Sequence, residues 1–352
     1  MRNLKRILKW LLSILVGLLL LIALAFAYLT ITDFHPAGIS MIYASREPAR
    51  IISTNDTLSL VDWNIGYAGL GANMDFFYEG GKHVRDTKAN TIRNIKGISS
   101  FLKANDTVDF VFIQEVDRNS KRTYHQDEFS EFDSTLQNFT GFYAMNYKTP
   151  FVPVPPTAPM GEVESGIAVF SRMDPVTVTR YAYPGNYAWP KRLFMLKRCF
   201  MVLRFAMDNG KDLVLINTHN SAYDGGKLKV QQTGQLSEYV KGEYQRGNYV
   251  VVGGDWNQCP PGFEPHFKVP FDTLFRSYLP QNYLHGWKKV FSDSVPTNRN
   301  VGTVFNAETS MRTVIDFFII SPNMEVISYK VADLGFRYAD HQPVRFTFTF
   351  KH

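Results

Sequence analysis

Residues 249–257 read YVVVGGDWN, an apolar run of strand length that ends in two polar side chains. A run of four to eight apolar residues bounded by Gly, Asn or Asp is typical of a buried strand. Asp255 and Asn257 close this run, and the same pattern recurs at LSLVDWN (58–64), VDFVFIQE (108–115) and LVLINTH (213–219). The runs that we expect to form strands are 58–63, 108–114, 166–170, 200–205, 213–218, 249–254, 313–320 and 344–350.

Two stretches with apolar residues at helical spacing, 86–103 and 227–243, lie between these expected strands. Many strands with a few interspersed helices predict an α/β fold in which two packed sheets are flanked by helices. The composition, 45% hydrophobic and 20% charged, excludes a disordered chain. Two cysteines, Cys199 and Cys259, exclude a disulfide scaffold and a cysteine-rich zinc module.

Residues 10–32 carry no charge and are long enough for a helix that crosses a bilayer core of about 30 Å. A cleaved signal peptide is the alternative, but its apolar region usually spans only about 7–15 residues. Arg2, Lys5, Arg6 and Lys9 precede the run, whereas the first basic residue after it is Arg46. This asymmetry predicts a single-pass membrane protein with its N-terminus in the cytoplasm and its body on the other side.

The chain therefore divides into a basic head (1–9), a transmembrane helix or uncleaved signal anchor (10–32), a linker (33–57) and one large domain (58–352). The formal net charge is +6, and the head supplies four positive charges, which leaves 6 − 4 = +2 for the rest. This nearly balanced body gives no bulk electrostatic evidence for binding a polyanion.

Polar side chains stand at the ends of several expected strands. If those strands lie side by side, the polar groups meet at one edge of the sheets, although a single Asp or Glu beside a strand is ordinarily a turn residue. The residues in question are Asn64, Glu115, His219, Asp255, Asn257, Asp316, Asp340 and His341.

The chemistry of this set is coherent. Carboxylates are hard oxygen ligands that suit Mg²⁺ or Mn²⁺, and the sequence has no HExxH motif that would favour zinc. Histidines with acidic partners supply proton transfer, and neutral amides can contact a phosphate without adding negative charge. The residues alone therefore indicate metal-assisted hydrolysis of a phosphoester.

The ordered motifs WNIG, IQEVD, SGIAVFSR, NTH, GDWN, IDFFIIS and ADHQPV resemble the endonuclease/exonuclease/phosphatase superfamily over about residues 58–350. One departure is Ala339, where family members have Ser before the DH pair. The resemblance implies a four-layer αββα sandwich with two central mixed β-sheets. It also implies a Mg²⁺ or Mn²⁺ site formed by Asn64, Glu115 and Asp340.

The resemblance implies a role for each of the remaining polar residues. The implied catalytic residues are His219, Asp255, Asn257, Asp316 and His341. Asp255 would orient or deprotonate the attacking water, and Asn257 would stabilise charge on the phosphoryl oxygens. His341, held by Asp316, would contact the scissile phosphate, and His219 would assist the leaving group. Arg198 either binds the phosphate or forms an ordinary salt bridge, and the segment PTNR (296–299) is a candidate substrate loop.

Three functions remain open on sequence grounds. The first is a membrane-anchored, metal-dependent phosphodiesterase of the nuclease type, and the second is the same chemistry on a phospholipid headgroup or another small phosphoester. The third is an inactive binding module, which the presence of Glu115, Asp255, Asn257 and His341 disfavours. The expected partners are the phosphoester substrate, nucleic acid or phospholipid headgroup, and the membrane, with no obligate protein partner.

Overall fold

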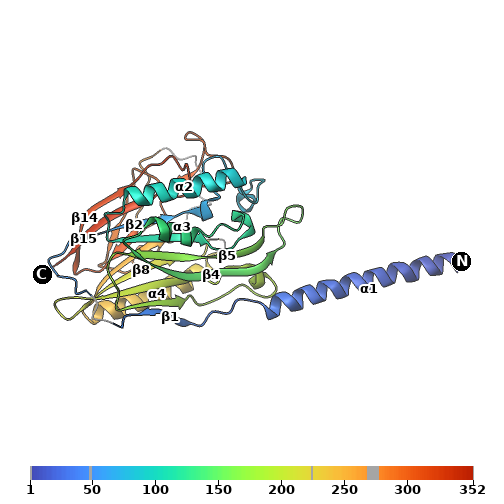
Figure 1. The fold of residues 1–352 in the computed structure, drawn as a ribbon, viewed down its shortest axis with the longest axis horizontal. Coiled ribbons are helices and arrows are strands. Elements are labelled where there is room, and N and C mark those ends of the chain that lie inside the picture. Colours follow the sequence, from blue (N-terminus) through green and yellow to red (C-terminus); the bar gives the residue numbers. More distant parts are fainter. Residues whose placement is uncertain (1, 47–49, 223–224, 268–276, 352) are drawn as a thin grey trace.

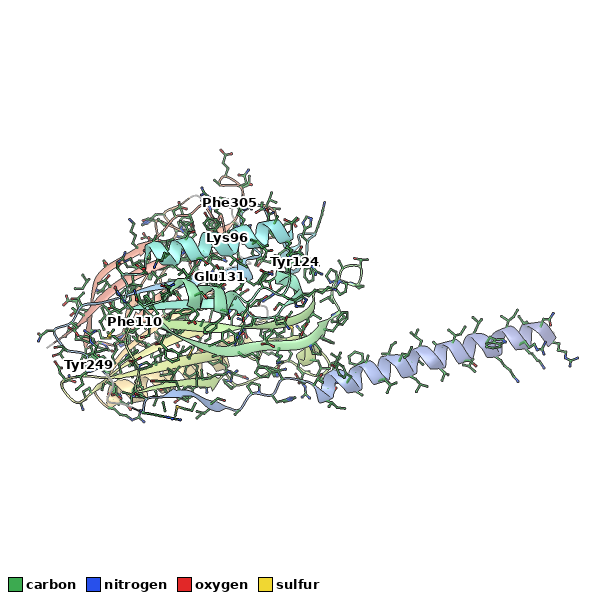
Figure 2. All side chains as sticks on the ribbon, in the orientation of Figure 1. Lys96, Phe110, Tyr124, Glu131, Tyr249 and Phe305 are labelled. Atoms are coloured by element: carbon green, nitrogen blue, oxygen red, sulfur yellow. The ribbon has the colours of Figure 1, made fainter. Side chains whose placement is uncertain are left out.

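The computed structural model describes residues 2–46, 50–222, 225–267 and 277–351 (Figure 1). Helix α1 (Arg2–Ile31) leaves one end of the body and has no buried residue. Figure 2 shows that α1 extends away from the body, so that the side chains along most of its length contact no other part of the molecule. It is the one helix among the described residues that is long and apolar enough to cross a membrane.

The body contains two large sheets and a two-stranded ribbon. The larger sheet has the strand order β1-β6-β7-β8-β9-β13-β10, and the smaller has the order β14-β15-β2-β3-β5-β4. Both sheets are mixed, because β2 pairs with β3 and β8 pairs with β9 in parallel while their other pairs are antiparallel.

The strands of the larger sheet are β1 (Ile39–Ala44), β6 (Thr177–Ala182), β7 (Cys199–Ala206), β8 (Asp212–His219), β9 (Tyr249–Asp255), β13 (Phe318–Ile320) and β10 (Lys288–Val290). Those of the smaller sheet are β14 (Met324–Val331), β15 (Val344–Phe350), β2 (Leu58–Asn64), β3 (Phe110–Asp117), β5 (Gly161–Ser171) and β4 (Thr140–Val152). The ribbon consists of β11 (Asn298–Arg299) and β12 (Arg312–Thr313).

Helices cover the outer face of each sheet. Helices α2 (Lys88–Ala104) and α3 (Glu128–Thr135) pack on the smaller sheet, and α4 (Lys227–Gln245) packs on the larger one. The Thr87 side chain caps α2 by accepting a hydrogen bond from the Asn90 N–H. The predicted αββα sandwich is thereby confirmed.

Alternation along the strands places successive side chains in different layers. In β3, Phe110 and Phe112 point between the two sheets, while Val111 and Ile113 lie under α2 and α3. Figure 2 labels Phe110 inside the body. This period of two is the geometry of a strand buried on both faces. The layer between the sheets is therefore filled by every second residue of the central strands.

Part of the segment expected as a linker belongs to the larger sheet. Residues 39–44 form the edge strand β1, which pairs with β6, because Ile42 and Tyr43 pack against the core between the sheets. Residues 47–49 of the same segment lie outside the described residues. Between α1 and β1, only residues 32–38 connect the helix to the body.

Candidate active site

The carboxyl ends of β2 and β3 in one sheet meet those of β8 and β9 in the other. These four strand ends carry Asn64, Glu115, His219 and Asp255. The Asn64 Nδ2 group donates a hydrogen bond of 2.9 Å to Asp255 Oδ2, which joins the two sheets directly. The structure thus brings together side chains that are separated by up to 191 residues in sequence.

Unusual backbone conformations present these side chains. Glu115 has a φ of +56° at an irregularity of the β3–β5 pairing, and Asn257 has a φ of +51° just after β9. Residues other than glycine rarely adopt this left-handed region, and such strain is concentrated at functional sites. Gly66 also has a positive φ, and a Cβ at this position would collide with the Asp340 carboxylate.

Asp255 is at the centre of the hydrogen-bond network. Its Oδ1 accepts the backbone N–H of Asn257 at 2.8 Å, and its Oδ2 accepts the Asn257 amide at 3.1 Å. The Nε2 atoms of His219 and His341 lie 3.4 Å and 3.9 Å from Asp255 Oδ2. This buried carboxylate is therefore flanked by two histidines and two amides.

His341 is held by Asp316. Its Nδ1 lies 2.8 Å and 3.0 Å from the two Asp316 oxygens, and its backbone carbonyl accepts the Trp63 indole N–H. Burial raises the pKa of Asp316 to about 6, against the opposing effect of His341. Burial alone would lower the pKa of His341, but the negative charges of Asp316 and Asp340 raise it well above its usual value.

The pKa values of His219 and Arg198 are lowered, in contrast to those of His341 and Asp316. Burial, together with the charges of Arg198 and His341, holds the pKa of His219 well below its usual value, so its ring is neutral at pH 7. Arg198 lines the same cavity, and burial lowers the pKa of its guanidinium while Glu115 and Asp255 oppose that shift. Its buried Nη1 has no hydrogen-bond partner among the described residues. This positive group is thus available to an anion.

The donor set that the sequence assigns to a metal fits a divalent cation. Glu115 and Asp340 line one cavity, and Asn64 Nδ2 lies 3.4 Å from Glu115 Oε1. Asp340 Oδ1 is buried without a hydrogen-bond partner in the described part of the chain. Burial raises the pKa of Asp340 to about 7, and the Glu115 charge adds to this effect. Two coupled carboxylates with an unsatisfied oxygen form a site that a hard cation would stabilise.

A second acidic group resembles a metal site by distance alone. Asp255, Asp316 and His341 offer ligand atoms within 4.8 Å of one another. Both oxygens of Asp316, however, already face Nδ1 of His341. The three residues are therefore arranged as a histidine, His341, that Asp316 holds beside the buried carboxylate of Asp255.

Sequence reasoning missed Tyr67, whose hydroxyl is buried at the same cavity. Tyr67 is 1% exposed, has a φ of +42°, and stacks against the Arg122 guanidinium 3.6 Å above its ring. Within the described residues, its hydroxyl has no hydrogen-bond partner. The one sequence signal was its place directly after the WNIG motif.

The segment 296–299, a candidate substrate loop, contacts His341 and Asp316, and its Asn298 lines the cavity. The Asn298 amide lies 3.0 Å from His341 Nε2, and the Thr297 hydroxyl accepts the Asp316 backbone N–H at 3.2 Å. The buried Arg299 donates to the carbonyls of Leu70, Gly71 and Met74. This segment thereby fixes the pair formed by His341 and Asp316, and also the loop that follows Asn64.

The site opens into a cavity of about 610 Å³. Its lining includes the polar site residues, the loop after β4 and residues of the segment 187–196. This volume is in the range of small-molecule sites.

Comparisons with known proteins identify a matching family model and solved structures of similar fold. The model of the Endonuclease/Exonuclease/phosphatase family matches residues 63–341. A search of curated proteins found no sequence that matches this chain.

Three solved structures illustrate the likeness in fold. An endonuclease/exonuclease/phosphatase from Beutenbergia cavernae is 17% identical, covering 84% of this chain and 72% of its own, with a TM-score of 0.55. One from Bacteroides vulgatus is 15% identical, covering 84% and 100%, with a TM-score of 0.51. The human nocturnin catalytic domain, solved with a sulfate anion, is 16% identical, covering 86% and 97%, with a TM-score of 0.51.

Proposed function

Because the chain belongs to the endonuclease/exonuclease/phosphatase family and is thus a phosphoester hydrolase, we propose that it is a membrane-anchored phosphodiesterase dependent on Mg²⁺ or Mn²⁺. The observation that carries this proposal is the meeting of four polar strand ends from two sheets around Asp255. Its support is geometric: Asn64 bridges to Asp255 at 2.9 Å, and His219 and His341 flank the same carboxylate.

Glu115 and Asp340, with Asn64 beside them, would hold the divalent ion. When bound, such an ion supplies positive charge that polarises the phosphoryl group. The Asn64 side-chain oxygen accepts the Gly66 N–H, which fixes the orientation of its amide between Glu115 and Asp255. This arrangement places the expected ligands in a preorganised position.

Asp255 would orient or deprotonate the attacking water, and Asn257 would stabilise charge on the phosphoryl oxygens. The Asp255 carboxylate accepts one hydrogen bond from Asn64 and two from Asn257, and these fix its orientation. The Asn257 amide, which also donates to the Asn220 carbonyl, contributes polarity without charge.

His341 and Arg198 would stabilise the phosphoryl group, and His219 would serve the leaving oxygen. The raised pKa of His341 favours the protonated ring, which is the form that stabilises negative charge. Arg198 adds a buried positive charge with an unpaired N–H among the described groups. His219 stays neutral and can donate or accept one proton.

Helix α1 would anchor the enzyme, with its basic N-terminal end in the cytoplasm and the catalytic body outside. Its length, its apolar composition and its preceding positive charges support this orientation. The body would lie on the periplasmic or extracellular side. Protease added to intact cells or to spheroplasts should cut it, and a body that is protected in spheroplasts but cut after lysis would contradict the orientation.

The test uses the full chain in detergent with bis-p-nitrophenyl phosphate. We expect hydrolysis with Mg²⁺ or Mn²⁺, none with EDTA, and a loss of at least about 100-fold in Glu115→Gln at low metal concentration. Glu325→Gln, an exposed carboxylate on β14, is the matched control and should keep full activity. Hydrolysis that survives both EDTA and Glu115→Gln would overturn the proposal.

A further inference from the structure

We propose that the substrate is a phospholipid of the bilayer that α1 spans, with its phosphodiester taken from the membrane surface into the active-site cavity. The inference rests on the proposed function and names the substrate of the same site. It follows from the contacts of α1 with segment 187–198, which supplies residues that line the cavity, and from the exposed apolar side chains of the loop between β4 and β5.

The end of α1 is fixed to one wall of the cavity. The rings of Phe26 and Trp189 are 5.7 Å apart, and the Trp189 indole N–H donates to the Thr30 hydroxyl at 3.3 Å. Two residues after the end of α1, the Asp33 side chain is only 2% exposed. Its carboxylate pairs with Lys197 at 3.1 Å and with Arg192 at 3.6 Å. The segment 187–198, which makes these contacts, also supplies lining residues of the cavity.

The connection leaves little freedom between helix and body. Seven residues, 32–38, separate α1 from β1, and an extended chain covers at most about 3.3–3.6 Å per residue. The Ala37 carbonyl in this connection accepts a hydrogen bond from Arg180 at 3.4 Å. A membrane around α1 would therefore lie close to the end of the body that carries segment 187–198.

A second segment that lines the cavity, the loop between β4 and β5, carries apolar side chains at the end of the body where α1 leaves. Figure 1 shows the loop between β4 and β5 projecting from the end at which α1 leaves. Phe151 at the base of this loop is 43% exposed, and Pro153 and Val154 line the cavity. The Arg85 guanidinium fastens the loop by donating to the Pro159 carbonyl at 3.0 Å. Exposed apolar side chains on a fixed loop are typical of a surface that contacts a membrane.

The lining of the cavity includes both charged and apolar side chains, as the binding of a phospholipid requires. Its phosphate would lie among Glu115, Arg198 and His341, and its apolar part would lie along Val154 and the wall that includes Phe194. A nucleic acid would instead need a basic track, whereas the body carries a net charge of only about +2 after the four N-terminal charges are subtracted from +6. The geometry therefore favours the lipid.

The reaction is a hydrolysis. The oxygen of water forms a bond to phosphorus, one of the two ester P–O bonds breaks, and a proton from the water passes to the departing alkoxide. The products are a phosphomonoester and an alcohol, and no redox partner is needed.

The test reconstitutes the full chain in vesicles of phosphatidylethanolamine and phosphatidylglycerol, and separately of sphingomyelin. We expect metal-dependent release of phosphomonoester and alcohol from one of these lipids. Phe151→Ser should lower the rate on that lipid about tenfold relative to the rate on soluble bis-p-nitrophenyl phosphate. Ile327→Ser is the matched control, because Ile327 is 54% exposed on β14, and it should leave the ratio of the two rates unchanged.

The outcomes separate this inference from the proposed function. If the reconstituted enzyme hydrolyses bis-p-nitrophenyl phosphate but leaves every vesicle lipid intact, the inference fails while the phosphodiesterase assignment stands. Faster cleavage of plasmid DNA than of lipid by the same vesicles would replace the lipid with nucleic acid. If metal supports hydrolysis of none of these diesters, the proposed function itself is wrong.

Discussion

The layer between the two sheets has an apolar end and a polar end, and the same strands build both. In β3 the inward side chains are Phe110 and Phe112 and then Gln114, and in β8 the inward leucines are followed by Asn217 and His219. At the polar end, the Gln114 amide donates to Asn217 Oδ1 at 2.8 Å across the layer. Packing thus holds one end of the layer, and hydrogen bonds hold the other.

A single strand can therefore contribute apolar side chains that stabilise the fold at one end and polar side chains that form the site at the other. Apolar side chains at the far end supply burial without any need for partners, whereas each buried polar group near the site must be paired or must face a ligand. Substitutions at the two ends should therefore affect different quantities. Activity should be sensitive at the polar end, and the free energy of unfolding should be sensitive at the apolar end.

The largest effect is expected from His341→Asn, which keeps a polar side chain but removes the ring held by Asp316. We expect hydrolysis of bis-p-nitrophenyl phosphate to fall about 10³-fold, at the upper end of what the loss of one group that stabilises transition-state charge costs. The melting temperature of the full chain in detergent should change little. His285→Asn, at an exposed position, is the control. An equal loss in both variants would remove His341 from the chemistry.

Phe112→Ala should have a comparable effect, on stability instead of rate. The side chain is fully buried between the sheets, and truncating a buried Phe costs about 3–5 kcal/mol of unfolding free energy. Thermal unfolding in detergent should shift down by about 10 °C. The activity of the folded protein should stay within about twofold of the parent. Phe151→Ala, in a half-exposed position, should shift the melting temperature far less. A large loss of activity in folded Phe112→Ala would show that the two ends are not separate.

Most residues of the polar end could be predicted from the sequence, because the signal that marks them lies in the residues next to them along the chain. Four of the site residues follow an apolar run directly, so Asn64, Glu115, His219 and Asp255 could be placed at strand ends without knowing which strands are neighbours. The α/β class and helices α2 and α4 were predictable for the same reason. The order of the strands was not, because it depends on pairings between distant segments.

Features that depend on distant contacts were missed. Strand β1 (ISMIYA) is apolar but lacks the alternation of a half-buried strand, and it is fixed by β6 and by two side chains that pack on the core. Helix α3 has only eight residues. The contact between Phe26 and Trp189 joins positions that no sequence period relates. Such contacts are products of the whole fold, and this one joins α1 to the segment that supplies lining residues of the cavity.

Tyr67→Phe tests whether a residue beside the polar end of the layer affects the rate or the stability. Its expected effect is smaller than those of His341→Asn and Phe112→Ala. Burial raises the pKa of Tyr67, although the Arg122 charge opposes this shift, so the hydroxyl keeps its proton at pH 7 and can donate to a phosphoryl oxygen. Removing it leaves the ring stacked on Arg122. We expect kcat to fall about tenfold, or about 1.4 kcal/mol. The melting temperature should hold or rise, because a buried hydroxyl without a partner in the described residues is destabilising.

Tyr147→Phe is the matched control for this variant, because its hydroxyl donates to the Phe194 carbonyl at 2.7 Å. Loss of that hydrogen bond should cost about 1 kcal/mol of stability and leave kcat within about twofold. The two tyrosines should therefore respond in opposite ways, one in rate and the other in melting temperature. If Tyr67→Phe instead lowers the melting temperature and leaves kcat unchanged, Tyr67 belongs with the packed residues, because its hydroxyl then stabilises the fold and does not reach the substrate.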